Sequence, residues 1–202
     1  DAAIIFSDIL TPLGPMGAEF DFSQGAPRLA APLRDVADFD RLTVVDPAAE
    51  LGFVADAIRL VCRERPQTPL IGFAGAPLTL AAYLVEGGGS SDFRHFKALL
   101  YREPEQAERL LARLADQVTR HLALQIDAGC AAVQVFDSWA SILHPADYRR
   151  FALPPLQTIF AGLADRGVPR ILFSKGGAGN LPALREVGAD ALSLDWTCDL
   201  AD

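Results

Sequence analysis

Side chains able to do chemistry recur at the ends of short apolar runs in this sequence. The first run ends on Ser7 and Asp8. A carboxylate at the end of a buried run must be solvated, paired or functional, because an isolated buried charge is costly. The later runs end on small, polar or aromatic residues, among them Asp137, Ser138, Ser174, Lys175 and Asp195. Such a set suits a cleft that binds a polar organic molecule.

Other common site patterns are missing from the sequence. The histidines His95, His121 and His144 lack the HxH or HExxH spacing of metal ligands. The glycine-rich stretches "EGGGSS" and "KGGAGN" match neither phosphate-binding fingerprint, and there is no GxSxG nucleophile elbow. These observations argue against a metal site, nucleotide binding and serine-hydrolase chemistry.

Composition limits the class of protein and of partner. With 202 residues, 50% of them hydrophobic, the chain can bury one sizeable core, and we treat residues 1–202 as a single domain. The net charge of −8 argues against nucleic acid or an anionic membrane surface as a partner. Three widely spaced cysteines without a CxxC pattern are typical of reduced thiols in a cytoplasm. No apolar run reaches the ~18 residues that a membrane span needs.

The elements that must position these side chains alternate along the chain. Strand-length apolar runs are followed by amphipathic helical patterns, several of which carry a proline near the start and a glycine after the end. The expected strands are 3–6, 69–73, 131–136, 169–173 and 191–194, and the expected helices are 46–65, 103–129, 145–167 and 180–190. We expect the stretch 11–32, with its scattered Gly and Pro, to be a long loop.

Alternation of this kind predicts a parallel α/β sheet. A (β/α)8 barrel and a doubly wound sheet both fit the pattern, and both place their active sites at the carboxyl ends of the strands. The chain begins without Met and directly in a strand, and it ends just after another, so we expect it to be a piece of something longer.

Four stretches carry a resemblance to a known family. They are "AAIIFSDIL", "PLIGFAGAPLTLAAYLVEGGGSSDF", "FDSWASIL" and "LSLDWT", in this order along the chain. Together they closely resemble the uroporphyrinogen decarboxylase family. The resemblance implies a (β/α)8 TIM barrel, of which this chain supplies about five βα units. It also implies a carboxy-lyase that converts the four acetate side chains of uroporphyrinogen III to methyls, giving coproporphyrinogen III in porphyrin and haem biosynthesis.

The resemblance also assigns roles to particular residues. Asp8 matches the central aspartate of the family, which accepts hydrogen bonds from the pyrrole N–H groups and acts in catalysis. Tyr83 matches a tyrosine whose hydroxyl lies near a substrate carboxylate, and Ser138 matches a small hydroxyl residue that contacts an acidic side chain of the substrate. Ile4 and Phe6 match apolar positions around the macrocycle. The family further implies a cytoplasmic homodimer that works without metal or organic cofactor.

Two departures from the family pattern bear on activity. The paired arginines of an RQAGR-type loop and the histidine of a GHG-type loop have no counterpart in these 202 residues. A substrate with eight carboxylates needs such cations, because guanidinium groups neutralise and bind carboxylates. We therefore expect the isolated chain to be inactive, with Lys175 as one cation that could reach the substrate.

Two alternatives stay open. One is a corrinoid-dependent methyltransferase related to this family, which binds zinc through His and Cys; the lack of a His-x-Cys partner for Cys130 or Cys198 speaks against it. The other is a barrel of the same kind that binds tetrapyrroles without turning them over.

Overall fold

Parallel strands form a sheet in which they follow one another in chain order. The structure is a computed structural model that describes residues 2–5, 7–23 and 25–199. Within these ranges the sheet has the order β1-β4-β5-β6-β7. Its strands are β1 (Ala3–Ile4), β4 (Leu70–Gly75), β5 (Ala132–Asp137), β6 (Arg170–Ser174) and β7 (Ala191–Leu194).

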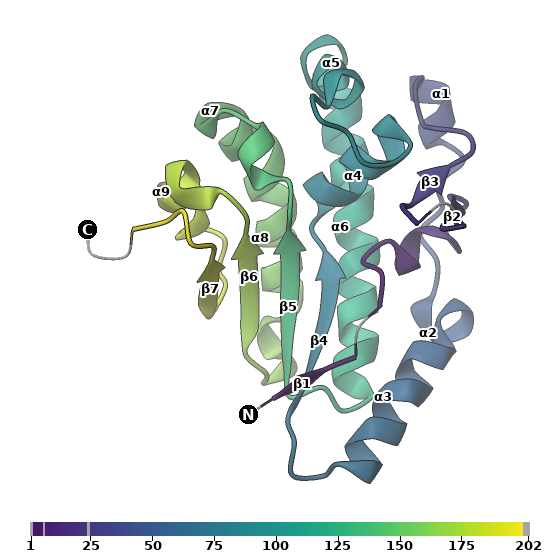
Figure 1. The fold of residues 1–202 in the computed structure, drawn as a ribbon, viewed down its shortest axis with the longest axis vertical. Coiled ribbons are helices and arrows are strands. Elements are labelled where there is room, and N and C mark those ends of the chain that lie inside the picture. The colour runs from purple at the N-terminus through teal and green to yellow at the C-terminus, as the bar shows by residue number, and fades with distance from the viewer. Residues whose placement is uncertain (1, 6, 24, 200–202) are drawn as a thin grey trace.

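The strand order distinguishes between the two expected topologies. A doubly wound sheet reverses its order at a switch point and carries helices on both faces. Here the order does not reverse, and Figure 1 shows α6 (Pro104–Asp127) and α8 (Leu153–Gly162) behind the sheet while the other face is open. The chain is therefore an arc of a TIM-barrel-like fold, as the sequence led us to expect.

The alternation of buried and half-buried residues along the strands distinguishes the two faces of the sheet. In β5, Val133, Val135 and Asp137 are buried, and the intervening Gln134 and Phe136 are half-buried. Side chains alternate between faces along a strand, so the buried set faces the helices and the half-buried set lines the open face. In a complete barrel this face belongs to the packed interior, and ligands bind at the carboxyl ends of the strands.

The long helix α6 makes up much of the helical layer that covers the sheet. Pro104 lies in its first turn, where a missing N–H costs nothing, and its side chains Leu110, Leu114, Val118 and Leu122 are buried in the main core. Gly129, just beyond its end, has φ +120, a conformation that favours glycine. This helix begins and ends as the sequence predicts.

The helix expected over 46–65 is divided into two. Asp46 caps α2 (Pro47–Glu50), because its side chain accepts a hydrogen bond from Ala48 N. Leu51 then leaves the helical region, with φ −122 and ψ 24, and α3 (Gly52–Glu64) begins at the next residue. The apolar period continues across the break, which is why the pattern alone does not locate it.

The sequence led us to expect that the prolines at 154 and 155 break or restart the helix over 145–167, and they lie in the first turn of α8. After α7 (Pro145–Asp147), residues Tyr148–Ala152 form a π-helical turn, in which Leu153 N donates to the carbonyl of Tyr148 five residues back. Because proline has no N–H to give to the residue four before it, a wider turn satisfies this stretch. The segment then continues directly into α8.

The stretch 11–32 is more ordered than a loop, so that expectation was wrong. It contains a 3-10 turn (Thr11–Leu13) and two short antiparallel strands, β2 (Phe20–Asp21) and β3 (Arg28–Leu29), which pair with each other. Beyond it lies α1 (Val36–Phe39). Buried Leu13, Met16 and Leu29 join the main core, which explains why the stretch is held in place.

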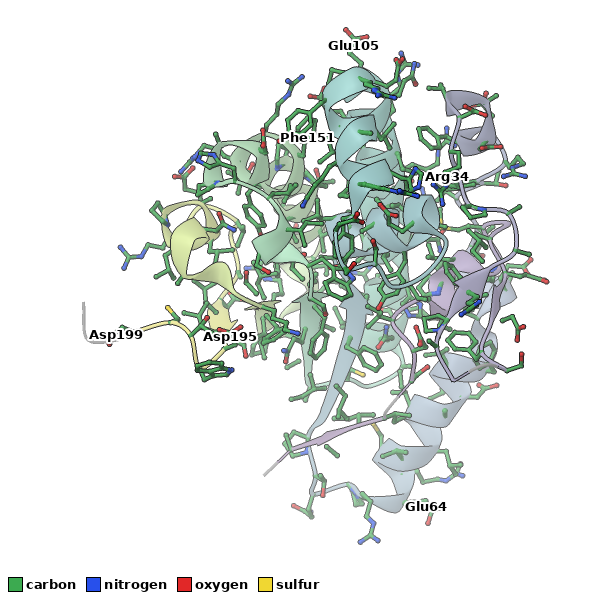
Figure 2. The ribbon with its side chains drawn as sticks, turned by 45° about the horizontal axis from the view of Figure 1, so that its top comes forward. Arg34, Glu64, Glu105, Phe151, Asp195 and Asp199 are labelled. Carbon is green, nitrogen blue, oxygen red and sulfur yellow. The ribbon has the colours of Figure 1, made fainter. Side chains whose placement is uncertain are left out.

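Three further helices belong to the βα units. Between β4 and α6 lie α4 (Pro77–Glu86) and α5 (Arg94–Arg102), and α9 (Leu181–Leu184) precedes β7. Figure 2 shows charged side chains such as Glu64 and Glu105 at the periphery, near the ends of α3 and α6. Within the described ranges, no helix is both long enough and apolar enough to cross a membrane.

Candidate active site

Asp8 lies in a tight turn just after β1. Its Oδ1 accepts a hydrogen bond from Leu10 N at 2.8 Å, and its backbone carbonyl accepts one from the Thr11 hydroxyl at 2.6 Å. The Thr11 hydroxyl lies 3.2 Å from that of Ser7. Among the described residues nothing is bonded to Oδ2, and the side chain is exposed. The turn thus orients a carboxylate and leaves one of its oxygens open to a ligand.

Tyr83 lies within electrostatic reach of Asp8. It is on α4 and half-buried. Burial, followed by the charge of Asp8, raises the pKa of the Tyr83 hydroxyl. The Trp139 indole partly opposes this rise, although its Nε1 makes no hydrogen bond of normal geometry to any described residue. Two residues that the sequence singled out, Asp8 and Tyr83, are therefore brought together.

Ser138 is linked to this pair through its neighbour. It follows β5 directly and is half-buried. The next residue, Trp139, packs on Tyr83 with a ring-centroid distance of 5.9 Å and on Phe93 at 4.8 Å. Ser138 is thus the first residue of a turn in which the next residue, Trp139, contacts Tyr83.

Asp137 does not face the cleft that the sequence suggested. It is fully buried on the helix side of the sheet, as is its register partner Ser174. The strand-end position was correct, but the two-residue period of a strand places Asp137 and Ser138 on opposite sides. Of the polar residues at the end of β5, Ser138 remains a candidate for ligand contact.

Three phenylalanines form a row across the open face of the sheet. Phe73, Phe136 and Phe173 come from β4, β5 and β6 and are all half-buried. The ring centroids of Phe136 lie 6.0 Å from Phe73 and 5.6 Å from Phe173. The apolar pattern of the sequence did not predict this row. The signal was present, because each ring stands one or two residues before the end of its strand.

The two apolar candidates, Ile4 and Phe6, have different outcomes. Ile4 is 45% exposed and pairs in register with Ile71, on the same face of the sheet as Phe73. Phe6 lies outside the described residues. Lys175 follows β6 and is exposed, and its charge helps to hold the pKa of Asp195 below its usual range, after hydrogen bonds from Thr197 and Gly176.

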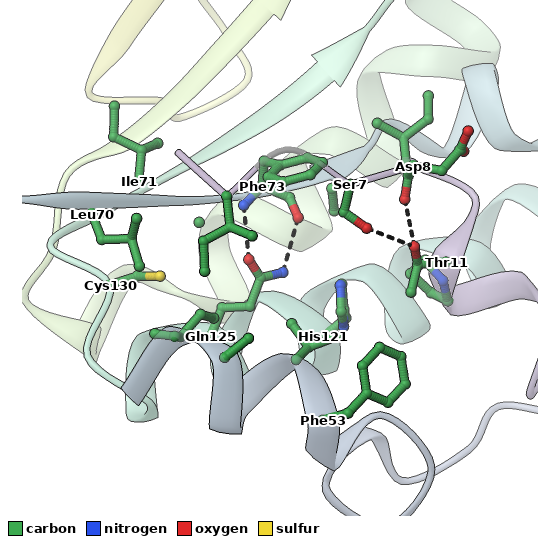
Figure 3. A pocket seen from close by; sticks show the side chains of 18 residues that line it. Ser7, Asp8, Thr11, Phe53, Leu70, Ile71, Phe73, His121, Gln125 and Cys130 are labelled. Atoms are coloured by element: carbon green, nitrogen blue, oxygen red, sulfur yellow. Dashed lines mark hydrogen bonds between the residues drawn. The ribbon is translucent and has the colours of Figure 1, made fainter. Parts of the chain in front are cut away.

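A cavity of about 210 Å³ lies on the other side of β1 and β4, against α3 and α6 (Figure 3). Its lining includes Asp8, Phe53, Phe73, His121 and Gln125. Gln125 closes the strand edge there, since its side-chain amide both accepts from Phe73 N and donates to Phe73 O at 2.9 Å. Pockets for drug-sized ligands usually measure about 300–1,000 Å³, so this cavity is small for a large ligand, and the carboxyl ends of the strands are the better place for one.

A protein metal site is not evident in the part of the chain that the structure describes. Groups of three or more His, Cys, Asp or Glu side chains suited to a metal ion are absent from residues 2–5, 7–23 and 25–199. Cys130 is buried, and burial raises the pKa of its thiol to about 12. A thiol of this kind is a poor metal ligand at neutral pH, because the thiolate is the form that binds metal.

A family model described as uroporphyrinogen decarboxylase (URO-D) matches residues 1–202. The chain is 46% identical over 198 residues to the uroporphyrinogen decarboxylase of Myxococcus xanthus, covering 98% of this chain and 57% of the relative. It is 50% identical over 206 residues to that of Pseudomonas aeruginosa strain LESB58, covering 99% and 58%.

Both curated relatives are longer than the chain, which spans slightly less than three fifths of their length. Among solved structures, a methyltransferase from Methanosarcina mazei has a TM-score of 0.78 at 16% identity, covering 95% of this chain and 56% of that one. At that identity the likeness concerns the fold alone.

Proposed function

The chain belongs to the uroporphyrinogen decarboxylase family, and we propose that it carries the central part of an enzyme that decarboxylates the four acetate side chains of uroporphyrinogen III. The product is coproporphyrinogen III, so the enzyme is a carboxy-lyase of porphyrin biosynthesis. The observation that carries this proposal is the position of Asp8. It is an exposed carboxylate at the carboxyl end of β1, oriented by its own turn and within electrostatic reach of Tyr83.

The reaction explains why a carboxylate is needed there. Direct loss of CO₂ from an acetate on a pyrrole would leave a carbanion. Protonation of the ring at carbon first creates a cation, into which the electrons of the breaking C–CO₂ bond flow. A proton delivered to the exocyclic carbon then takes the place of CO₂ and gives the methyl group. The ring finally loses the proton that it gained at the start, so the net change is one CO₂ lost and one proton taken up.

Asp8 contributes through its charge and its fixed position. The four pyrrole N–H groups of the puckered macrocycle converge on one point, where the open Oδ2 would accept their hydrogen bonds. An anion at that point stabilises the protonated, cationic ring more than the neutral one. Because this stabilisation grows along the reaction, it lowers the barrier instead of only strengthening substrate binding.

The surrounding residues suit the remaining parts of the substrate. Tyr83 and Ser138 offer hydroxyls to substrate carboxylates, and Ile4 and Phe6 would line the pocket around the macrocycle. The row formed by Phe73, Phe136 and Phe173 supplies an apolar surface near the carboxyl ends of three strands, on which pyrrole rings can rest. Lys175 adds one exposed cation for an acidic side chain.

We also propose the setting in which the enzyme works. It is a cytoplasmic homodimer that uses neither metal nor organic cofactor and does not bind nucleic acid or membranes. The 202-residue chain alone is proposed to be inactive, because a substrate with eight carboxylates needs more cations than Lys175 to neutralise it.

An anaerobic incubation tests the activity. The longest reading frame that contains the chain is incubated with uroporphyrinogen III, and the carboxylates of the oxidised products are counted by mass spectrometry. We expect the loss of four CO₂ per macrocycle, and none with heat-denatured protein. A folded protein that removes no CO₂ would contradict the proposal, and stoichiometric bound zinc would then favour the corrinoid-dependent methyltransferase.

A further inference from the structure

A buried carboxylate lies on the helix side of the sheet, next to the turn that carries Ser138 and Trp139. Asp137 ends β5, and its side chain has no exposed surface. We propose that Asp137 is a positioning residue, which acts through Thr79 to hold Trp139 against Tyr83 at the candidate site. The relevance of this arrangement to catalysis rests on the proposed function, whereas the arrangement itself can be tested without any substrate.

Hydrogen bonds connect the carboxylate to the turn. The Thr79 hydroxyl donates to Asp137 Oδ1 at 3.0 Å, and the Tyr148 hydroxyl donates to Oδ2 at 2.9 Å. The Thr79 oxygen accepts a hydrogen bond from Trp139 N at 3.3 Å. A threonine hydroxyl has one proton, so donating it to Asp137 leaves the oxygen lone pairs for the Trp139 amide. The carboxylate thereby fixes the direction of the hydroxyl that holds the turn.

Helix α4 contacts Trp139 at two points. Thr79 and Tyr83 are four residues apart and so lie on one face of this helix. Thr79 holds the backbone of Trp139, while the Tyr83 ring packs on its indole at 5.9 Å. Phe93, which packs on the same indole, has φ 52, a value that residues other than glycine rarely adopt. Trp139 is thus held through backbone and ring together, and Tyr83 with it.

The Asp137 carboxylate meets hydroxyl groups on the elements packed against it. Thr79 comes from α4 and Tyr148 from the π-helical turn, and Tyr148 is the titratable one of the two. Burial raises the pKa of Asp137 to about 6, against the opposing effect of the bonds from Tyr148 and Thr79. Among described residues no Lys, Arg or His contributes to this pKa. At neutral pH the carboxylate is therefore mainly ionised and accepts from both hydroxyls.

Tryptophan fluorescence reports the arrangement directly. The sequence has two tryptophans, and Trp196 is 93% exposed, so Trp196→Phe leaves Trp139 as the single reporter in the chain. In this background we compare Thr79→Val, Thr79→Ser, Asp137→Asn and Tyr148→Phe. Valine has the shape of threonine without the hydroxyl, and serine keeps the hydroxyl, which makes these two a matched pair.

The expected result distinguishes a positioning role of Asp137 and Thr79 from a general contribution of these residues to the stability of the core. Thr79→Val and Asp137→Asn shift Trp139 emission to longer wavelength and increase its quenching by acrylamide, while Thr79→Ser leaves both unchanged. Identical emission and quenching for the valine and serine variants would overturn the proposal. If Asp137→Asn does not fold, the Thr79 pair decides alone, because both of its members keep the carboxylate.

A kinetic measurement connects the arrangement to the proposed reaction. In the longest reading frame that contains the chain, Thr79→Val should lower kcat/KM for uroporphyrinogen III by about 10- to 100-fold, the usual effect of a misplaced site residue, and Thr79→Ser should restore it. If fluorescence responds but kcat/KM does not, Asp137 has no positioning role in catalysis and that part of the inference is wrong. If the wild type itself has no activity, the proposed function fails and the fluorescence result still stands.

Discussion

Tyr83 and Asp8 lie within electrostatic reach of each other although they come from α4 and from the turn after β1. Burial, and next the charge of Asp8, raises the pKa of the Tyr83 hydroxyl. The pKa of Tyr101 is raised by its hydrogen bond to Asp147, and that of Tyr148 well above its usual value by burial and then by Asp137. These three are the tyrosines of the chain.

A tyrosine titration tests this relationship. We expect the tyrosinate absorbance of the folded chain to rise with midpoints above a pH of about 10, because all three pKa values are raised above that of a free phenol. Tyr83→Phe should remove one step above that pH. A step near or below pH 9 that disappears with Tyr83→Phe would contradict the proximity of Asp8 and Tyr83.

Stability should depend on pH through Asp137. Its pKa is about 6 in the folded chain and about 3.9 when unfolded, so the folded state binds the proton more tightly. The free energy of unfolding therefore falls as pH rises from about 4 to about 6, by about 3 kcal/mol in full. Asp137→Asn should remove this fall. Urea unfolding at pH 5 and pH 7.5 gives the comparison, and equal pH dependence in wild type and variant would refute it.

His121 should have the opposite effect. Burial lowers its pKa to about 4, and its Nδ1 has no hydrogen-bond partner among the described residues. The unfolded chain then binds the proton more tightly, so stability falls as pH drops from about 6.5 to about 4. At pH 5 this loss amounts to about 2 kcal/mol relative to pH 7. His121→Phe should lack it, and thermal unfolding at the two pH values measures the difference.

Close packing at Gly72 should make even a methyl group costly. A Cβ there would lie 2.8 Å from Gln125 Oε1 and 3.0 Å from Cys130 Sγ. Gly72→Ala therefore displaces the amide that bonds Phe73 and should destabilise the chain by about 1–3 kcal/mol. Gly52→Ala is the matched control, because nothing lies within 4 Å of its Cβ position. A Gly72→Ala variant as stable as the control would show that the strand edge can relax.

Much of the fold was predictable because hydrophobic period and turn residues act locally. The five strands and the helix ending before Gly129 follow from them. The break at Leu51 and the π-helical turn at Tyr148–Ala152 did not, because the apolar period continues through both. The sequence did not predict the pairing of β2 with β3, because a strand of two residues is too short to show the alternation of apolar and polar residues.

The candidate site was predictable only in part. Asp8 and Ser138 stood out as polar residues at strand ends, whereas Tyr83 and the roles of all three came through the family resemblance. No local property of the sequence brings the three together. The burial of Asp137 on the opposite side of the sheet depends on strand register, which pairs it with Ser174. The row of Phe73, Phe136 and Phe173 likewise emerges only when three strands are aligned.

The most direct test of the account concerns the charge of Asp8. Asp8→Asn is compared with wild type in the longest reading frame that contains the chain, by steady-state kinetics with uroporphyrinogen III. Asp46→Asn is the matched control, since Asp46 is also exposed and its Oδ1 likewise accepts a hydrogen bond from the amide two residues on. We predict that Asp8→Asn lowers kcat at least about 100-fold with little change in KM, and that Asp46→Asn has no effect. An Asp8→Asn enzyme that keeps its kcat would contradict the central role of this carboxylate.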